Sequence, residues 1–231
     1  NIMLNDKKIE IIMPALNEEK NIGKVIEDIP SFVERIIVSD NGSIDNTAIE
    51  AQKKGAYVVS QPIKGYGNAC LKAMEYISDD TDIVVFLDSD YSDYPDQLIE
   101  LINPIIDENY DMVLGRRIVK EKKALTPVQR FGNKFACVLI KLFYNFKYYD
   151  LGPFRAIKKD ALMKLKIKDK NYGWTVEMQI KAIKNKMLVK EVNVSYRKRF
   201  SGKSKVSGNI KGILCAGWKI IYLIFKELFK K

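Results

Sequence analysis

The sequence predicts an α/β fold with a mostly parallel, doubly wound sheet, because apolar strand-like runs alternate with helix-like segments through its first half. The chain has 231 residues, 47% of them hydrophobic, which is enough to enclose one sizeable core. We find no Gly/Ser-rich or Pro-rich linker and no internal repeat. We therefore expect one main domain at 1–207, followed by an amphipathic helix at 208–231.

The expected strands are short apolar runs bounded by Pro, Gly or acidic residues, at Lys8–Met13, Arg35–Ser39, Ala56–Ser60, Asp82–Leu87 and Asp111–Leu114. The expected helices lie between them, at Glu18–Ile29, Asp45–Lys54, Gly67–Ile77 and Pro95–Asp107. Asn17 is the expected N-cap of the first helix, and Gly55 the terminator of the second.

Composition excludes several kinds of chemistry. The chain has no histidine, so His-based triads, His-ligated zinc and imidazole acid–base catalysis are excluded, and acid–base or metal chemistry must use carboxylates. The net charge of +10 has two interpretations, which are solvated surface lysines or attraction to an anionic partner such as nucleic acid, a phosphorylated substrate or an acidic membrane.

Cysteine usage and hydropathy suggest a cytoplasmic location. Cys70, Cys137 and Cys215 are far apart and set among apolar residues, so we expect reduced core cysteines in a cytosolic protein. We find no signal peptide and no uncharged apolar stretch of about 18 residues, the length needed to span a bilayer.

Polar residues follow four of the expected strands. They are Pro14-Ala15-Leu16-Asn17-Glu18, Asp40-Asn41-Gly42-Ser43, Asp88-Ser89-Asp90 and Gly115-Arg116-Arg117. Ligands of doubly wound sheets bind at the carboxyl ends of the strands, so these segments predict a binding site at one edge.

Asp88 and Asp90 flank one residue at the end of the fourth strand. Such a pair is either an acidic turn or a site for Mg²⁺ or Mn²⁺, which prefer oxygen ligands and leave positions open for phosphate. Asp40 is either part of an Asx turn or an acceptor for nucleoside hydroxyl and N–H groups. The segment from Lys64 to Gly67 precedes a helix, and its glycines would let the backbone approach a nucleotide. It lacks the spacing of a P-loop.

Taken in order, four segments resemble family-2 glycosyltransferases of the GT-A fold, and they are Pro14 to Glu18, Ser39 to Asp45, Lys64 to Gly67 and Asp88 to Asp90. Later segments resemble dolichyl- or polyprenyl-phosphate hexose synthases, and they are Gly115-Arg116-Arg117, Gly152-Pro153-Phe154-Arg155, Tyr172-Gly173-Trp174-Thr175-Val176-Glu177-Met178 and Tyr196-Arg197-Lys198-Arg199 through Lys205. The resemblance runs from about Ile9 to about Ser207. Leu16, Ser39 and Ser92 depart from residues that are common in the family, which bears on the base and the sugar.

The resemblance implies a metal-dependent hexosyltransferase that moves a hexose, with inversion, from a nucleotide sugar to a lipid phosphate. UDP-glucose is favoured and GDP-mannose is the alternative. The implied donor residues are Pro14, Ala15, Leu16, Glu18, Asp40, Lys64, Gly65, Asp88 and Ser89. Asp88 and Asp90 would hold Mg²⁺ or Mn²⁺. The implied catalytic set is Asp90, Arg117, Arg199 and Lys205. Glu177, on the helix expected after Gly173, joins that set as a residue that could face the acceptor, or else it is a surface helical carboxylate.

The missing histidine fits this reaction, because a phosphate monoester is already anionic and needs positioning more than a general base. One alternative is a glycosyltransferase with a soluble or polysaccharide hydroxyl acceptor, which would need Glu177 or an acidic neighbour as its base. Another is a non-enzymatic basic module that binds RNA. Acidic strand ends disfavour nucleic acid. A third alternative is a sugar-phosphate nucleotidyltransferase. It would require a Gly-rich phosphate loop directly after the first strand, where this sequence has Pro14-Ala15-Leu16-Asn17-Glu18 instead.

Two segments have a basic stripe on an otherwise apolar helix. In Pro127–Phe146 the stripe is Arg130, Lys134 and Lys141, and in Asn209–Lys231 it is Lys211, Lys219, Lys226 and Lys230. Such helices lie either on a bilayer surface or against the core or a partner subunit. With a lipid-phosphate acceptor, we expect a peripheral protein at the inner face of the cytoplasmic membrane. A homo-oligomer or a membrane-protein partner is compatible with these helices.

Overall fold

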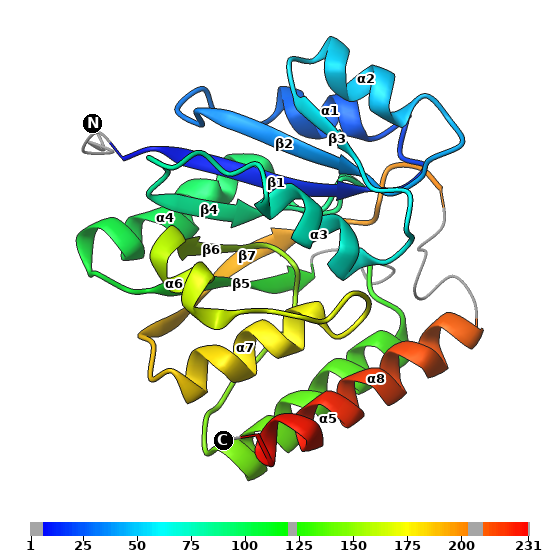
Figure 1. Cartoon of the computed structure of the whole chain (residues 1–231). Coiled ribbons are helices and arrows are strands. Elements are labelled where there is room, and N and C mark those ends of the chain that lie inside the picture. The colour runs from blue at the N-terminus through cyan, green and yellow to red at the C-terminus, as the bar shows by residue number, and fades with distance from the viewer. Residues whose placement is uncertain (1–6, 120–123, 203–209, 231) are drawn as a thin grey trace.

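The computed structural model describes residues 7–119, 124–202 and 210–230. A seven-stranded sheet forms its centre, in the order β3-β2-β1-β4-β6-β5-β7 (Figure 1). The strands are β1 (Ile9–Ala15), β2 (Arg35–Asp40), β3 (Tyr57–Ser60), β4 (Ile83–Phe86), β5 (Met112–Val119), β6 (Arg155–Lys158) and β7 (Val189–Tyr196). All neighbours pair in parallel except β6, which runs antiparallel to both β4 and β5. This arrangement confirms the predicted mostly parallel α/β fold.

Helices cover both faces of the sheet. They are α1 (Ile22–Glu27), α2 (Thr47–Lys53), α3 (Tyr66–Met74), the 3₁₀ helix η1 (Pro95–Gln97), α4 (Leu98–Asp107), α5 (Pro127–Tyr144), α6 (Lys159–Leu165), α7 (Trp174–Lys184) and α8 (Ile210–Leu228). Alternate strand residues point to opposite faces, so Ile12 belongs to a core cluster with residues of α3, α6 and α7, whereas Ile11 belongs to one with residues of α1, α2 and α4. Two apolar cores result, one on each face, which explains why β1 and β4 are buried throughout.

The first helix is shorter than its sequence pattern indicates. Asn17 is not its N-cap, because α1 begins at Ile22 after Asn21. Asn17 has a left-handed backbone (φ 52°) and joins two strand-end loops, since its amide N–H donates to Ser43 Oγ (2.9 Å) and its Oδ1 accepts from Ile44 N–H (2.9 Å). The residues after β1 are therefore tied to the residues after β2, instead of forming a first helical turn.

The cysteines divide between core and surface. Cys70 and Cys137 are buried free thiols, as expected, but Cys215 is exposed on α8, so the expectation of a core position was wrong for it. Apolar neighbours in the sequence did not indicate burial, because α8 also leaves apolar side chains in contact with solvent.

At the bottom of Figure 1, α5 and α8 form a layer outside α7, far from the sheet. The two helices contact each other through the Phe143 and Phe225 rings, whose centroids are 4.9 Å apart, and through Tyr144 Oη, which donates to the Ile224 carbonyl (2.6 Å). Leu223 and Ile224 of α8 are buried. No helix in the described residues has both the length and the apolar character needed to cross a bilayer.

Glycine is required where α3 meets the segment before α7. A Cβ built on Gly67 would lie 2.0 Å from the Asp169 carbonyl oxygen, whereas one built on Gly132 of α5 meets nothing within 4 Å. We expect Gly67→Ala to lower the free energy of unfolding by about 1–3 kcal/mol, because backbone must move to admit the methyl group. Gly132→Ala is the control and should raise stability by up to about 1 kcal/mol through helix propensity. Urea denaturation of both variants measures this, and equal stabilities would contradict it.

Candidate active site

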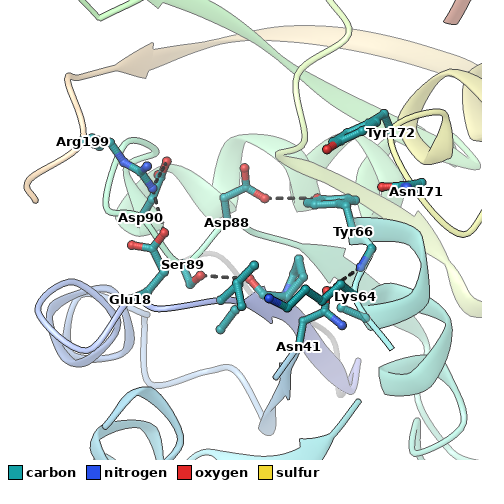
Figure 2. A pocket seen from close by; sticks show the side chains of 15 residues that line it. Glu18, Asn41, Lys64, Tyr66, Asp88, Ser89, Asp90, Asn171, Tyr172 and Arg199 are labelled. Atoms are coloured by element: carbon teal, nitrogen blue, oxygen red, sulfur yellow. Dashed lines mark hydrogen bonds and ion pairs between the residues drawn. The ribbon is translucent and has the colours of Figure 1, made fainter. Parts of the chain in front are cut away.

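A cavity of about 360 Å³ opens at the carboxyl edge of β1, β2 and β4, where the sequence predicted a site. Its lining includes ten predicted residues, which are Pro14, Ala15, Leu16, Glu18, Lys64, Gly65, Asp88, Ser89, Asp90 and Arg199. Five further residues line the cavity without having been predicted individually, although the first two and the last lie in segments that the sequence analysis singled out. They are Asn41, Tyr66, Ala69, Asn171 and Tyr172. In Figure 2, Glu18, Asp90 and Arg199 lie on one side, Tyr66, Asn171 and Tyr172 on the other, and Asp88 between them.

Asp88 lies at the inner end of the acidic pair. Its Oδ1 accepts a hydrogen bond from Tyr66 Oη (3.1 Å). Burial, together with the nearby charge of Asp90, raises the pKa of Asp88 to about 7, and burial beside Asp88 raises the pKa of Tyr66 well above its usual value. Asp88 therefore holds its proton more tightly than an exposed carboxyl group, because its surroundings only partly stabilise the negative charge.

Asp90 and Glu18 share one arginine. Arg199 Nη2 lies 3.1 Å from Asp90 Oδ2 and 2.8 Å from Glu18 Oε1. Asp90 Oδ1 also accepts from the Ser92 backbone N–H (3.0 Å), which fixes the turn after β4. Ser89 points the other way and donates to the Pro14 carbonyl (2.9 Å), joining the β4 turn to β1. The backbone around the acidic pair is thus held in place before any ligand binds.

A further acidic side chain, Asp93, lies near the pair. Asp93 is buried, and within the described residues neither of its carboxylate oxygens has a hydrogen-bond partner. Burial, with Asp88 and Asp90 close by, raises the pKa of Asp93 well above its usual range. This edge of the sheet is therefore short of positive charge.

Asn41 positions the Lys64 side of the cavity. Its side-chain N–H₂ donates to the carbonyls of Gln61 (2.9 Å) and Ile63 (2.8 Å), and its Oδ1 accepts from Gly65 N–H (2.7 Å). Gly65 has φ 141°, a conformation that favours glycine. Asn41, which was expected only as part of the turn after β2, therefore holds the Lys64-Gly65 backbone where it can approach a nucleotide.

Asp40 and Arg117 do not line the cavity. Asp40 ends β2, and its buried Oδ1 has no hydrogen-bond partner in the described part of the chain. Arg117 forms a bidentate ion pair with Asp150, with Nε at 2.8 Å from Oδ2 and Nη2 at 2.7 Å from Oδ1. Burial alone would lower the pKa of Arg117, but this pair outweighs burial and raises it. Its positive charge is thus already committed to Asp150.

Glu177 lies neither on the surface nor in the cavity. Its carboxylate is 2% exposed, accepts from the backbone N–H groups of Lys168 (3.0 Å) and Asp169 (2.6 Å), and pairs with Lys181 (2.6 Å). The structure gives Glu177 a role in holding the segment before α7, and it does not place the side chain where it could face an acceptor.

The basic segment after β7 is anchored as far as Ser201. The Arg197 guanidinium stacks 3.4 Å from the Tyr91 ring centroid, Arg199 pairs with Glu18 and Asp90, and the Ser201 carbonyl accepts from Asn21 Nδ2 (3.2 Å). Lys205, predicted to meet phosphates, lies outside the described residues.

Sequence similarity identifies the family. A model of "Glycosyl transferase family 2" matches residues 10–166. The chain belongs to glycosyl transferase family 2. An uncharacterized glycosyltransferase of Mycobacterium tuberculosis is 33% identical to this family-2 member over 216 residues, with 92% of this chain and 97% of the relative covered. A dolichyl-phosphate hexose transferase of Haloferax volcanii is 29% identical, with 86% of each chain covered.

Solved structures agree on the fold. Glucosyl-3-phosphoglycerate synthase from Mycobacterium tuberculosis in complex with phosphoglyceric acid superposes on this family-2 glycosyltransferase with a TM-score of 0.78 at 23% identity, covering 97% of this chain and 81% of that one. The same enzyme with Mn²⁺, UDP-glucose and phosphoglyceric acid gives a TM-score of 0.77, also at 23% identity, covering 97% and 80%. The predicted GT-A fold is confirmed.

The raised pKa of Asp88 predicts how stability depends on pH. The folded pKa, about 7, exceeds the unfolded value of about 3.9, so the stability that protonated Asp88 contributes is lost as pH rises through 7. Asp88→Asn keeps an acceptor for Tyr66 and has no charge to bury. We expect the melting temperature of Asp88→Asn minus that of wild type to increase as the pH rises from 5 to 8. Asp107→Asn, at an exposed site on α4, is the control, and a difference that stays constant with pH would contradict the prediction.

Proposed function

We propose that this family-2 glycosyltransferase moves a hexose from a nucleotide-diphosphate sugar to a polyprenyl or dolichyl phosphate, with UDP-glucose favoured as donor. The observation that carries the proposal is the cavity at the carboxyl edge of the sheet, which has Asp88 and Asp90 between Lys64 on one side and Arg199 on the other. Support for the chemistry comes from relatives named as dolichyl-phosphate hexose and N-acetylglucosamine transferases, and from the UDP-glucose complex of the structural neighbour.

The residues present fit a divalent cation. Three carboxylates line the cavity (Glu18, Asp88 and Asp90) against two cationic side chains (Lys64 and Arg199), and Asp93 adds a buried carboxylate with unpaired oxygens. No group of three or more His, Cys, Asp or Glu side chains arranged to hold a metal occurs in the described ranges. We infer that Asp88 and Asp90 would hold Mg²⁺ or Mn²⁺ and leave room for diphosphate oxygens. Bound there, the cation would supply charge neutralisation for the departing diphosphate.

The chain's own side chains would perform the remaining steps. Lys64 and the Gly65 backbone would border the nucleotide, while Arg199 would offer its guanidinium to phosphate oxygens in exchange for Asp90. Nε and Nη1 of Arg199 are buried without hydrogen-bond partners in the described part of the chain, so donors remain for an anion. Tyr66 would keep Asp88 oriented through its hydroxyl group.

A phosphate acceptor suits this cavity better than a hydroxyl acceptor. A hydroxyl group must lose its proton to a base during transfer. Glu177 lies outside the cavity and Glu18 is paired with Arg199, so neither is free to act as that base. A phosphate monoester is already anionic and needs only to be positioned. The alternative of a hydroxyl acceptor therefore loses Glu177 as its base and would need Asp88 or Asp90, which we assign to the cation.

We further propose that the enzyme works at a membrane surface. We call the outer surface of the last helical layer the α5–α8 face. Its exposed apolar side chains are Val128, Phe131, Phe135, Val138, Leu142, Phe143, Trp218, Tyr222, Phe225 and Phe229. Exposed cations accompany them at Arg130, Lys134, Lys141 and Lys226. Between Pro127 and Tyr144 the sequence has no acidic residue, and in α8 the one acidic residue, Glu227, is buried. Aromatic and basic residues without exposed acids complement an anionic lipid surface.

Asp90→Ala tests the proposed reaction. We expect transfer from labelled UDP-glucose to polyprenyl phosphate with Mn²⁺ to fall at least about 100-fold, because charge stabilisation of the diphosphate is lost. Asp107→Ala is the matched control and should keep full activity. GDP-mannose, soluble phosphoglycerate and a hydroxyl acceptor are assayed in parallel. Undiminished transfer by the Asp90 variant would refute the metal assignment, and transfer to the soluble acceptors alone would refute the lipid acceptor.

Sedimentation with vesicles tests the membrane surface. Wild type should sediment with phosphatidylglycerol vesicles and much less with phosphatidylcholine vesicles. The double variant Phe131→Ser with Trp218→Ser removes side chains that are 72% and 71% exposed, so it should bind at least about tenfold more weakly while folding normally. Leu188→Ser, also at an exposed apolar site but away from this face, should bind like wild type. If wild-type protein stays in the supernatant with both kinds of vesicle, the proposed membrane binding is ruled out.

A further inference from the structure

Part of the cavity wall comes from a loop that follows no strand. Residues 166–173, which we call the wall loop, join α6 to α7 and bring Asn171 and Tyr172 into the cavity on the same side as Tyr66 (Figure 2). Loops between helices have no ladder of hydrogen bonds to fix them. The contacts that hold this loop therefore decide the shape of the cavity on that side.

The two ends of the wall loop have different supports. At its start, Glu177 of α7 accepts from the Lys168 and Asp169 backbone N–H groups. At its end, Asp169 Oδ1 accepts from the backbone N–H groups of Asn171 (2.8 Å) and Gly173 (3.0 Å). Asp169 is thus the side chain that sets the backbone on both sides of Tyr172.

Asp169 in turn depends on α8. Its side chain is 2% exposed, and its Oδ2 lies 2.8 Å from Lys219 Nζ, while Lys219 keeps 36% of its side chain exposed. Leu223, one turn further along α8, packs against the loop where it enters α7, since a Cβ on Gly173 would lie 1.9 Å from Leu223 Cδ1. A buried carboxylate that loses its cation is costly, so removing Lys219 would favour movement of Asp169 towards water.

On its other side the wall loop rests on α3. The Lys170 carbonyl accepts from Asn68 N–H (2.9 Å) at the first turn of α3, and the Asp169 carbonyl occupies the space that a side chain at Gly67 would need. The same turn of α3 carries Tyr66, and Gly65 precedes it. The wall loop is therefore clamped between α8 and the cavity-lining end of α3.

We propose that Lys219 is a positioning residue for donor binding, which acts from α8 through Asp169 to hold Asn171 and Tyr172 against the cavity. The proposal rests on the proposed function in one respect, namely that the cavity takes a nucleotide sugar. Lys219 does not line the cavity, and its effect on the donor passes through the wall loop. In this assignment α8 is part of the donor-binding apparatus, although it lies far from the sheet.

Substitution of Lys219 tests the proposal in full-length protein without lipid. Lys219→Met removes the cation and keeps the alkyl chain, and Lys219→Arg restores a cation. We expect Lys219→Met to weaken UDP binding with Mn²⁺ and to raise the donor KM by about tenfold, with a much smaller change in kcat, because the wall is displaced but the acidic pair is untouched. Lys219→Arg should recover most of the affinity. Lys164→Met, an exposed lysine of α6, is the control and should match wild type.

Hydrogen exchange provides a readout that does not depend on the reaction. The amides of Asn171 and Gly173, which donate to Asp169, should exchange faster in Lys219→Met than in wild type and return towards wild-type rates in Lys219→Arg. Unchanged exchange and unchanged nucleotide affinity in Lys219→Met would overturn the proposal, as would a loss that Lys219→Arg fails to repair. If wild type binds neither UDP nor GDP with Mn²⁺, the proposed function fails, and the exchange rates still decide the role of Lys219.

Discussion

Burial of carboxylates at the end of β4 is the constraint around which this edge of the molecule is organised. Burial and the nearby charge of Asp90 raise the pKa of both Asp88 and Asp93, and the sheet keeps these side chains together because β4 is covered on both faces. The nearby Arg117 cannot neutralise them fully, since it is held by Asp150. Arg199, from the segment after β7, fills part of the deficit. A cation bound at the pair and the Arg199 guanidinium therefore compete for Asp90.

The first half of the fold could be predicted because its signal is local. The runs that became β1, β4 and the start of β5 are mainly apolar, and the run that became β2 has an apolar centre, as doubly covered parallel strands need. The later strands β6 and β7 were not predicted. β6 has four residues, and its position between β4 and β5 depends on antiparallel pairing across a long stretch of sequence. β7 is only partly buried, so its composition carries little apolar pattern.

The candidate site could be predicted where residues follow a strand directly. Asp88, Ser89 and Asp90 are of this kind, and the geometry of the sheet brings them to the cavity. Asn171 could not be found in this way, because it reaches the cavity through contacts of the wall loop with α3 and α8. Glu177 shows that a side chain's direction is harder to predict than its place in the chain. Its place on a helix was predicted, but the direction of its side chain depends on packing, and the loop amides it binds take it away from the cavity.

The close packing of Leu223 on Gly173 has a consequence for dividing the chain into parts. The sequence places a natural boundary after residue 207, between a catalytic domain and an amphipathic tail. In the folded protein a cut there would uncover Gly173, take Ile224 out of the core and leave the charge of Asp169 without Lys219. The shortest fragment that keeps an intact cavity wall therefore extends through α8. Shortened versions made for solubility would lose part of the structure that shapes the cavity.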